Sequence, residues 1–139
     1  MSMSVEEAQK IVAPLYEALN RPSEKDVSAL LAQACNADYR SYPSNQDSLS
    51  RDELADVFKG IGLIIPDLRW TIEEVVTVDD KICVRGEAAG TPVRDLYGAK
   101  PTGKSFRIMS IDLFTVKNSK LATAFHLENW MSAVQQISS

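Results

Sequence analysis

Asp112 and His126 are the two residues whose types and spacing could do acid/base chemistry. Asp112 lies in an apolar run that ends near Val116, and His126, the only histidine of the chain, lies in the next such run. An imidazole has an ordinary pKa of roughly 6.5, so it exchanges protons close to neutral pH. A neighbouring carboxylate orients the ring and favours its charged form. The pair could therefore transfer protons to and from a bound molecule.

Two assignments of base and acid are open at this point. Either His126 is the base and Asp112 orients its ring, or a desolvated Asp112 with a raised pKa is the base and His126 is its partner. An aldol cyclisation or a related proton transfer needs a base for a carbon acid and a donor for the developing alkoxide, inside a dry pocket. The same two residues could also form a satisfied structural pair across a sheet.

Whether the two side chains meet depends on a turn. The stretch 105–130 contains two runs rich in Val, Ile, Phe and Thr around a short polar break, which predicts a long antiparallel hairpin. With a two-residue loop, Asp112 would face Phe125, and His126 would point to the other face. With a three-residue loop, Asp112 faces His126, and Asn118 tolerates the left-handed backbone that such a loop needs. The register stays open.

Two further features of the strands bear on the site. Ser110, with Asp112 and His126, supplies the residue types of a hydrolytic triad, but no sharp turn exposes Ser110 as a nucleophile. Glu74 interrupts the alternating apolar residues Trp70, Ile72, Val76 and Val78. It is either a pocket carboxylate or the mark of a bulge or rim position, and the second is favoured because Glu is seldom fully buried.

The sequence predicts three helices before these strands. A Ser followed three residues later by a carboxylate marks helix starts at Ser4, Ser23 and Ser50. Apolar residues at helical spacing extend the predicted helices over 4–20, 23–35 and 50–65. Pro14 should kink the first helix, and Pro66 should end the third.

Strands dominate the rest of the chain. A short extended segment is predicted at 36–43, and a hairpin turns at Asp79-Asp80 between 68–78 and 81–90. The loop 91–103 contains enough Gly and Pro to exclude regular structure apart from a turn. Helices followed by strands indicate an α+β fold, in which a curved antiparallel sheet packs its concave face on the N-terminal helices and forms a cone around a cavity.

Composition and charge limit the classes of partner that the protein is expected to bind. The 139 residues fit a single domain over 1–139, and 45% hydrophobic content is ordinary for a globular protein. A net charge of −4 without a basic cluster argues against nucleic acid and anionic membranes. No leader or membrane span is apparent, which favours a cytoplasmic protein. Cys35 and Cys83 lie too far apart, with one histidine, to predict a metal site, and we expect free thiols.

The runs PDLRWTIEEVVTVDDKICVRGEAAGTP and YGAKPTGKSFRIMSIDLFTVKNSKLATAFHLENW resemble the SnoaL-like polyketide cyclase (ester cyclase) family of the nuclear-transport-factor-2-like fold. The resemblance covers about residues 36–132. It implies a cone-shaped, cystatin-like α+β barrel that holds a small hydrophobic molecule, is a homodimer or a tetramer, and performs an intramolecular aldol condensation without a cofactor.

The resemblance also implies a site. Its cyclases carry a His on the first strand of the last hairpin and an acid/base Asp on the second, and the matching positions are Asp112 and His126, with the types exchanged. Gly86 stands where many members have a bulky aromatic residue, which would widen the pocket, and Ser119 replaces the usual turn Gly.

We expect the pocket to be lined by Tyr16, Tyr39, Tyr42, Trp70, Gly86, Ser110, Phe114 and Trp130. For the tyrosines and tryptophans, packing in the core or at an interface is favoured over a role in binding. The apolar second face of the hairpin, formed by Ile111, Leu113, Phe125 and Leu127, predicts that a helix layer or a subunit partner covers it.

The function predicted from these observations is a cofactor-independent acid/base enzyme that acts on a small hydrophobic carbonyl compound, with no metal. One alternative is a non-catalytic binder of a small apolar ligand with the same fold. Another is an epoxide hydrolase of the limonene type, which would need an Asp, Arg, Asp set. Arg85 and Arg107 are the candidate arginines, and strand parity places Arg107 on the face opposite Asp112.

Overall fold

The computed structural model describes residues 3–139. The helices are α1 (Val5–Ala18), the 3-10 turn η1 (Pro22–Glu24), α2 (Val27–Ala34), α3 (Arg51–Ile64) and α4 (Trp130–Ser138). The strands are β1 (Cys35–Tyr42), β2 (Leu49–Ser50), β3 (Arg69–Val78), β4 (Lys81–Gly90), β5 (Phe106–Lys117) and β6 (Lys120–Glu128). The predicted α+β class is confirmed, although β1 and β2 precede α3 and α4 follows the last strand.

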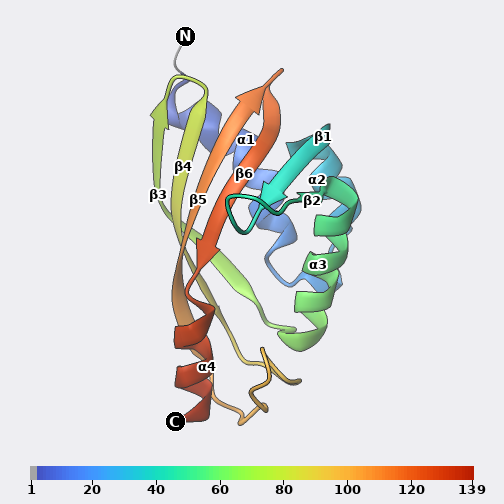
Figure 1. Cartoon of the computed structure of the whole chain (residues 1–139), viewed down its shortest axis with the longest axis vertical. Helices are drawn as coiled ribbons and strands as arrows, with labels where there is room; N and C mark the ends of the chain where they lie inside the picture. Colours follow the sequence, from blue (N-terminus) through green and yellow to red (C-terminus); the bar gives the residue numbers. More distant parts are fainter. Residues whose placement is uncertain (1–2) are drawn as a thin grey trace.

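The six strands form one sheet in the order β2-β1-β6-β5-β4-β3. Figure 1 shows α1, α2 and α3 gathered on one side of this sheet, with α4 beyond the end of β6. The β1–β6 pair is parallel, whereas every other pair is antiparallel. The sheet is therefore mixed and open, which corrects the expectation of an entirely antiparallel, barrel-like cone.

Side-chain caps fix the helix starts. Ser4 and Ser50 each form a complete capping box with Glu7 and Glu53, as predicted. The start predicted at Ser23 is wrong, because Asp26 itself caps α2 by accepting a hydrogen bond from the amide of Ala29. At the N3 position of a capping box Asp is less favourable than Glu, whereas at the N-cap position Asp is favourable. This difference explains why the helix begins after Asp26 and not after Ser23.

A bulge in β3 settles the position of Glu74. Ile72 pairs with Gly86 and Glu74 with Arg85, so one residue of β3 has no opposite partner in β4. Beyond the bulge the faces exchange, and the predicted grouping of Val76 and Val78 with Trp70 is wrong, since both valines are exposed. Glu74 is exposed and forms an ion pair with Arg85 at 3.1 Å, so it is not a pocket carboxylate.

The C-terminal helix α4 was absent from the sequence-based prediction. Its N-cap is Asn129, whose side chain accepts a hydrogen bond from the amide of Ser132. Ala133 and Ile137 are fully buried, so α4 packs one apolar stripe against β5, near the start of that strand. Within residues 3–139, the helices are too short or too polar to cross a membrane.

Candidate active site

The hairpin of β5 and β6 places Asp112 directly opposite His126. The turn itself has two residues, Asn118 and Ser119, both in the left-handed region with φ of 55° and 64°. A two-residue turn was expected to separate the pair, and that expectation is wrong. Thr115 pairs with Thr123 and Val116 with Leu121, so Ala122 is an extra residue in a β-bulge that restores the pairing.

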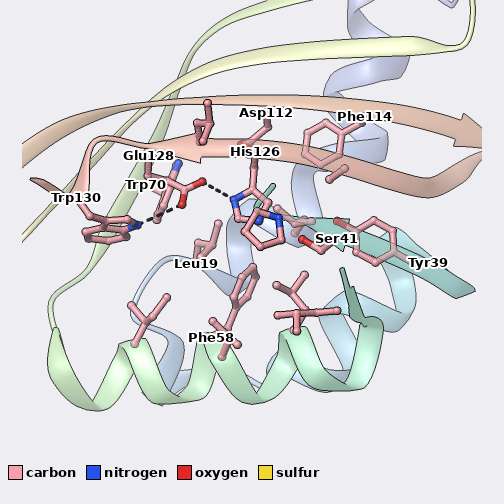
Figure 2. A pocket seen from close by; sticks show the side chains of 18 of the residues that line it. Leu19, Tyr39, Ser41, Phe58, Trp70, Asp112, Phe114, His126, Glu128 and Trp130 are labelled. Carbon is pink, nitrogen blue, oxygen red and sulfur yellow. Dashed lines mark hydrogen bonds and ion pairs between the residues drawn. The ribbon is translucent and has the colours of Figure 1, made fainter. Parts of the chain in front are cut away.

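A cavity of about 350 Å³ lies between this hairpin, α1 and α3. Figure 2 shows Asp112, His126 and Glu128 on the sheet side of the cavity and Leu19 and Phe58 on the helix side. Within the described chain, no lysine or arginine lines it. The lining is mostly apolar and comprises Leu15, Leu19, Tyr39, Ser41, Pro43, Leu49, Leu54, Val57, Phe58, Ile61, Trp70, Tyr97, Asp112, Phe114, Ala124, His126, Leu127, Glu128 and Trp130.

Asp112 is buried at the wall of the cavity, with 7% of its surface exposed. The hydroxyl of Tyr16, on α1, donates a short hydrogen bond to Asp112 Oδ2. Burial disfavours the carboxylate and raises the pKa of Asp112 to about 6, although the hydrogen bond from Tyr16 works in the opposite direction. Asp112 is therefore a stronger base than an exposed aspartate, and it is still mostly ionised above pH 7.

His126 is held by a second carboxylate, that of Glu128. His126 Nδ1 lies 2.6 Å from Glu128 Oε2, and Trp130 Nε1 donates to Glu128 Oε1 at 3.2 Å. Burial alone would lower the pKa of His126, but the hydrogen bond to Glu128 and the negative charges of Glu128 and Asp112 outweigh burial and raise it. Near neutral pH the ring therefore retains more of its charged form than a free histidine.

Sequence reasoning assigned no role to Glu128, which shares a face of β6 with His126. The two residues are two apart on one strand, so alternation puts both side chains toward the cavity. That spacing was the signal available, because a carboxylate two residues from an inward-facing histidine can reach its ring.

The structure brings some of the predicted lining residues together and separates others. Tyr39, Trp70, Phe114 and Trp130 line the cavity. Tyr16 lies behind Asp112 and contacts it through the hydrogen bond described above. Ser110 is buried outside the lining, and its hydroxyl accepts a hydrogen bond from Trp70 Nε1 at 3.0 Å.

Tyr42 and Gly86 do not line the cavity. Tyr42 is on the outer face of the sheet, where its ring stacks on Phe125 at 4.5 Å, because Tyr39 and Ser41 already take the inward positions of β1. A Cβ on Gly86 would lie 2.9 Å from Ser110 Oγ and 3.3 Å from Trp70 Nε1. The missing side chain of Gly86 thus makes room for the Trp70 indole and does not widen the cavity.

The arginines needed by the epoxide hydrolase alternative point away from the site. Arg85 pairs with Glu74, and Arg107 pairs with Glu87 at 3.3 Å, both as exposed ion pairs. An Asp, Arg, Asp set is therefore not assembled in this cavity. The triad alternative also lacks support, since Ser110 supports the Trp70 indole from outside the cavity lining.

Asp112, His126 and Glu128 each offer one possible metal-ligand atom, and these three atoms lie within 4.8 Å of one another. His126 Nδ1 bonds to Glu128, and Asp112 Oδ2 accepts a hydrogen bond from the hydroxyl of Tyr16. The arrangement fits a set of proton donors and acceptors beside an apolar cavity. It offers one desolvated base and one charged donor to a bound carbonyl compound.

Comparisons with known proteins identify the family and the fold. Residues 10–137 match the family model of SnoaL-like polyketide cyclases. The structure of TsrD from Streptomyces laurentii is similar, with a TM-score of 0.83, 19% identity and coverage of 97% of each chain. IdmH of Streptomyces antibioticus, a candidate polyketide cyclase, has a TM-score of 0.79, 19% identity and coverage of 94% of this chain and 98% of its own.

A third similar structure is a protein with a ketosteroid isomerase-like fold from Catenulispora acidiphila DSM 44928. Its TM-score is 0.73 at 14% identity, with coverage of 93% of this chain and 92% of its own. Identities this low establish the shared fold and no more. Curated proteins give no match.

Proposed function

The chain belongs to the SnoaL-like polyketide cyclase family, and from this premise we propose that it is a cofactor-independent acid/base enzyme acting on a small hydrophobic carbonyl compound. The reaction is an intramolecular aldol condensation or a related isomerisation. The observation that carries the proposal is the opposition of Asp112 and His126 across β5 and β6, at the wall of an apolar cavity.

The proposed roles follow from the electrostatics of the two groups. Asp112, with a pKa of about 6, is ionised at pH 7 and takes a proton from the carbon next to the carbonyl group. His126, whose raised pKa favours its charged form, stabilises the enolate oxygen and then protonates the alkoxide that the new carbon–carbon bond creates. Asp112 finally returns its proton to His126, so the reaction consumes no proton.

The cavity supports the substrate class. Its 350 Å³ and its leucine, isoleucine and aromatic walls suit an uncharged apolar molecule, with the carbonyl groups directed to the sheet side. Tyr39, Phe58, Phe114 and Trp70 provide aromatic surface from β1, α3, β5 and β3. The proposal therefore includes a flat, partly aromatic substrate.

A probe reaction tests the base without knowledge of the natural substrate. α-Tetralone is a small bicyclic ketone, and in D₂O the protein should accelerate exchange of the hydrogens on the carbon next to its carbonyl group, as followed by NMR. Asp112→Asn should reduce this acceleration by at least about a hundredfold, which is the usual contribution of a general base. Glu74→Gln, which alters an exposed carboxylate, is the control and should leave the rate unchanged.

The pH dependence of the exchange provides the second part of the test. The rate should rise with pH as Asp112 ionises near pH 6 and fall again at higher pH as His126 loses its charge. A rate that simply increases with pH would contradict the role of His126. Full activity of Asp112→Asn would contradict the role of Asp112.

Non-catalytic binding of an apolar ligand is the second candidate. It is favoured by the fact that Asp112 and His126 already have partners within the protein, Tyr16 and Glu128. This function would be supported in place of catalysis if the natural protein and Asp112→Asn both bind α-tetralone and other aryl ketones saturably. Neither protein should then exchange the hydrogens of any of these ketones.

Three further expectations from the sequence belong to the same proposal. We take residues 1–139 as one domain, supported by the single cluster of buried side chains that extends from α1 to α4. We place the protein in the cytoplasm, where the free thiols of Cys35 and Cys83 would stay reduced. We also infer a homodimer, supported by the exposed apolar outer face of β5 and β6.

A further inference from the structure

Glu128 lies between two ring N–H groups at the end of β6. Its side chain is 14% exposed, and each of its oxygens has its own partner, His126 Nδ1 at 2.6 Å and Trp130 Nε1 at 3.2 Å. Figure 2 shows both contacts as dashed lines on the sheet side of the cavity. The indole fixes the carboxylate, and the carboxylate in turn fixes the imidazole.

The contact determines which nitrogen of His126 carries a proton when the ring is neutral. An ionised carboxylate only accepts hydrogen bonds, so the nitrogen facing Glu128 Oε2 must be the donor. Nδ1 therefore holds the proton, and Nε2 is the nitrogen left for exchange with a bound molecule.

The charges around His126 favour a second proton, on Nε2. Asp112 faces the ring from β5 and Glu128 from β6. The other titratable groups nearby are the phenols of Tyr16 on α1, Tyr39 on β1 and Tyr97 in the loop after β4, and burial raises the pKa of each. These phenols are neutral near pH 7, and no lysine or arginine lines the described cavity. Two carboxylates without another cation stabilise a charged imidazolium.

We propose that Glu128 is the positioning residue that makes His126 the proton donor of the site, by holding one proton on Nδ1 and stabilising a second on Nε2. Asp112 is then left as the base. The role in catalysis rests on the proposed function, but the protonation of the ring does not. Glu128 itself needs no contact with the substrate.

NMR can test the inference directly, because the chain has a single histidine. In protein labelled with ¹⁵N-histidine, the nitrogen shifts should show the Nδ1–H tautomer at high pH and a titration midpoint above that of a free histidine. Glu128→Gln keeps the length of the side chain and removes the charge, so its midpoint should move to lower pH. Glu74→Gln, matched in chemistry but far from the ring, should leave the midpoint in place.

In the α-tetralone assay, Glu128→Gln should lose about tenfold or more in kcat with little change in KM, and the falling limb of its pH profile should move to lower pH. An Nε2–H tautomer in the natural protein, or an unchanged midpoint in Glu128→Gln, would overturn the inference. If Glu128→Gln does not fold, the tautomer of the natural protein still decides.

The NMR result separates this inference from the proposed function. A protein that shows the expected tautomer and midpoint but exchanges no ketone hydrogen retains the Glu128 inference about the ring and loses the enzyme assignment. A protein that exchanges the hydrogen with an Nε2–H ring retains the enzyme and loses the role of Glu128.

Discussion

Asp112 is a residue at which function opposes stability. Folding places its carboxyl group beside Tyr16 with 7% of its surface exposed, and the resulting pKa near 6 lies above the ordinary value of 3.8. Between these two values the folded chain binds more protons than the unfolded chain, so stability falls as pH rises through this range. The folded state thus favours the protonated form of Asp112, whereas the proposed reaction needs its ionised form.

Asp112→Asn should therefore stabilise the protein at pH 7.5 while it abolishes exchange. The shift from 3.8 to about 6 corresponds to about 3 kcal/mol, which is an upper value because Asn must also fit the Tyr16 hydroxyl. Urea denaturation should show this gain at pH 7.5 and little of it at pH 4. Asp56→Asn, at an exposed position of α3, should change stability little at either pH. A loss of stability at pH 7.5 in Asp112→Asn would contradict this reading.

At the scale of the element, the hairpin shows which structural features the sequence could predict and which it could not. Strand alternation groups Phe106, Ile108, Ser110, Asp112, Phe114 and Val116 on one face, and all of them except the half-buried Val116 are buried in β5. The bulge at Ala122 was missed, although Leu121 and Ala124 are both buried at a spacing of three that a regular strand does not allow. The pairing of Asp112 with His126 depends on that bulge, and loop length alone could not predict it.

The missed helix and the misplaced start of α2 have a related cause. Trp130, Ala133 and Ile137 follow a helical spacing after the Asn129 cap, but the short segment follows a strong strand signal. At Ser23, the local motif competed with a better cap three residues later, and only the packed structure decides between them. Local patterns predict the types of the elements, whereas their ends depend on contacts between them.

The turn of the same hairpin offers a test of its strain. Ser119 has a φ of 64°, which costs a residue with a Cβ about 1 kcal/mol and costs Gly little. Asn-Gly is also the preferred pair for a two-residue hairpin turn. Ser119→Gly should therefore raise the free energy of unfolding by about 1 kcal/mol in urea denaturation, with unchanged α-tetralone exchange. Ser119→Ala is the control and should give no gain.

At the scale of the whole molecule, the sheet has one face toward the helices and one outer face. Ile111 pairs with Leu127, and Leu113 with Phe125, on the outer face, where all four side chains are exposed, and Leu127 also borders the cavity. An apolar patch of this kind on a protein surface indicates an interaction site. The open sheet thus separates two roles, with the site on the inside and the inferred dimer contact on the outside.

The dimer can be tested by light scattering after size-exclusion chromatography. The natural protein should have the mass of two chains, and Leu113→Arg should weaken association at least about tenfold, because it buries a charge without a partner. Val78→Arg adds the same charge at an exposed valine near the β3–β4 turn and should remain dimeric. A natural protein with the mass of one chain at all concentrations would exclude this contact.

The position of β6 between β1 and β5 also determines the order in which the molecule can be assembled. During synthesis β1 and β2 emerge early, but the inner edge of β1 pairs only with β6, so Cys35 meets Leu121 after more than half of the chain has followed. Contacts between residues so distant in sequence form slowly. His126 and Glu128 lie on that same late strand. In a nascent chain that ends before β6, β1 and β2 are therefore not paired with the rest of the sheet, and the site is incomplete. Such a chain exposes a strand edge that chaperones or neighbouring chains can bind.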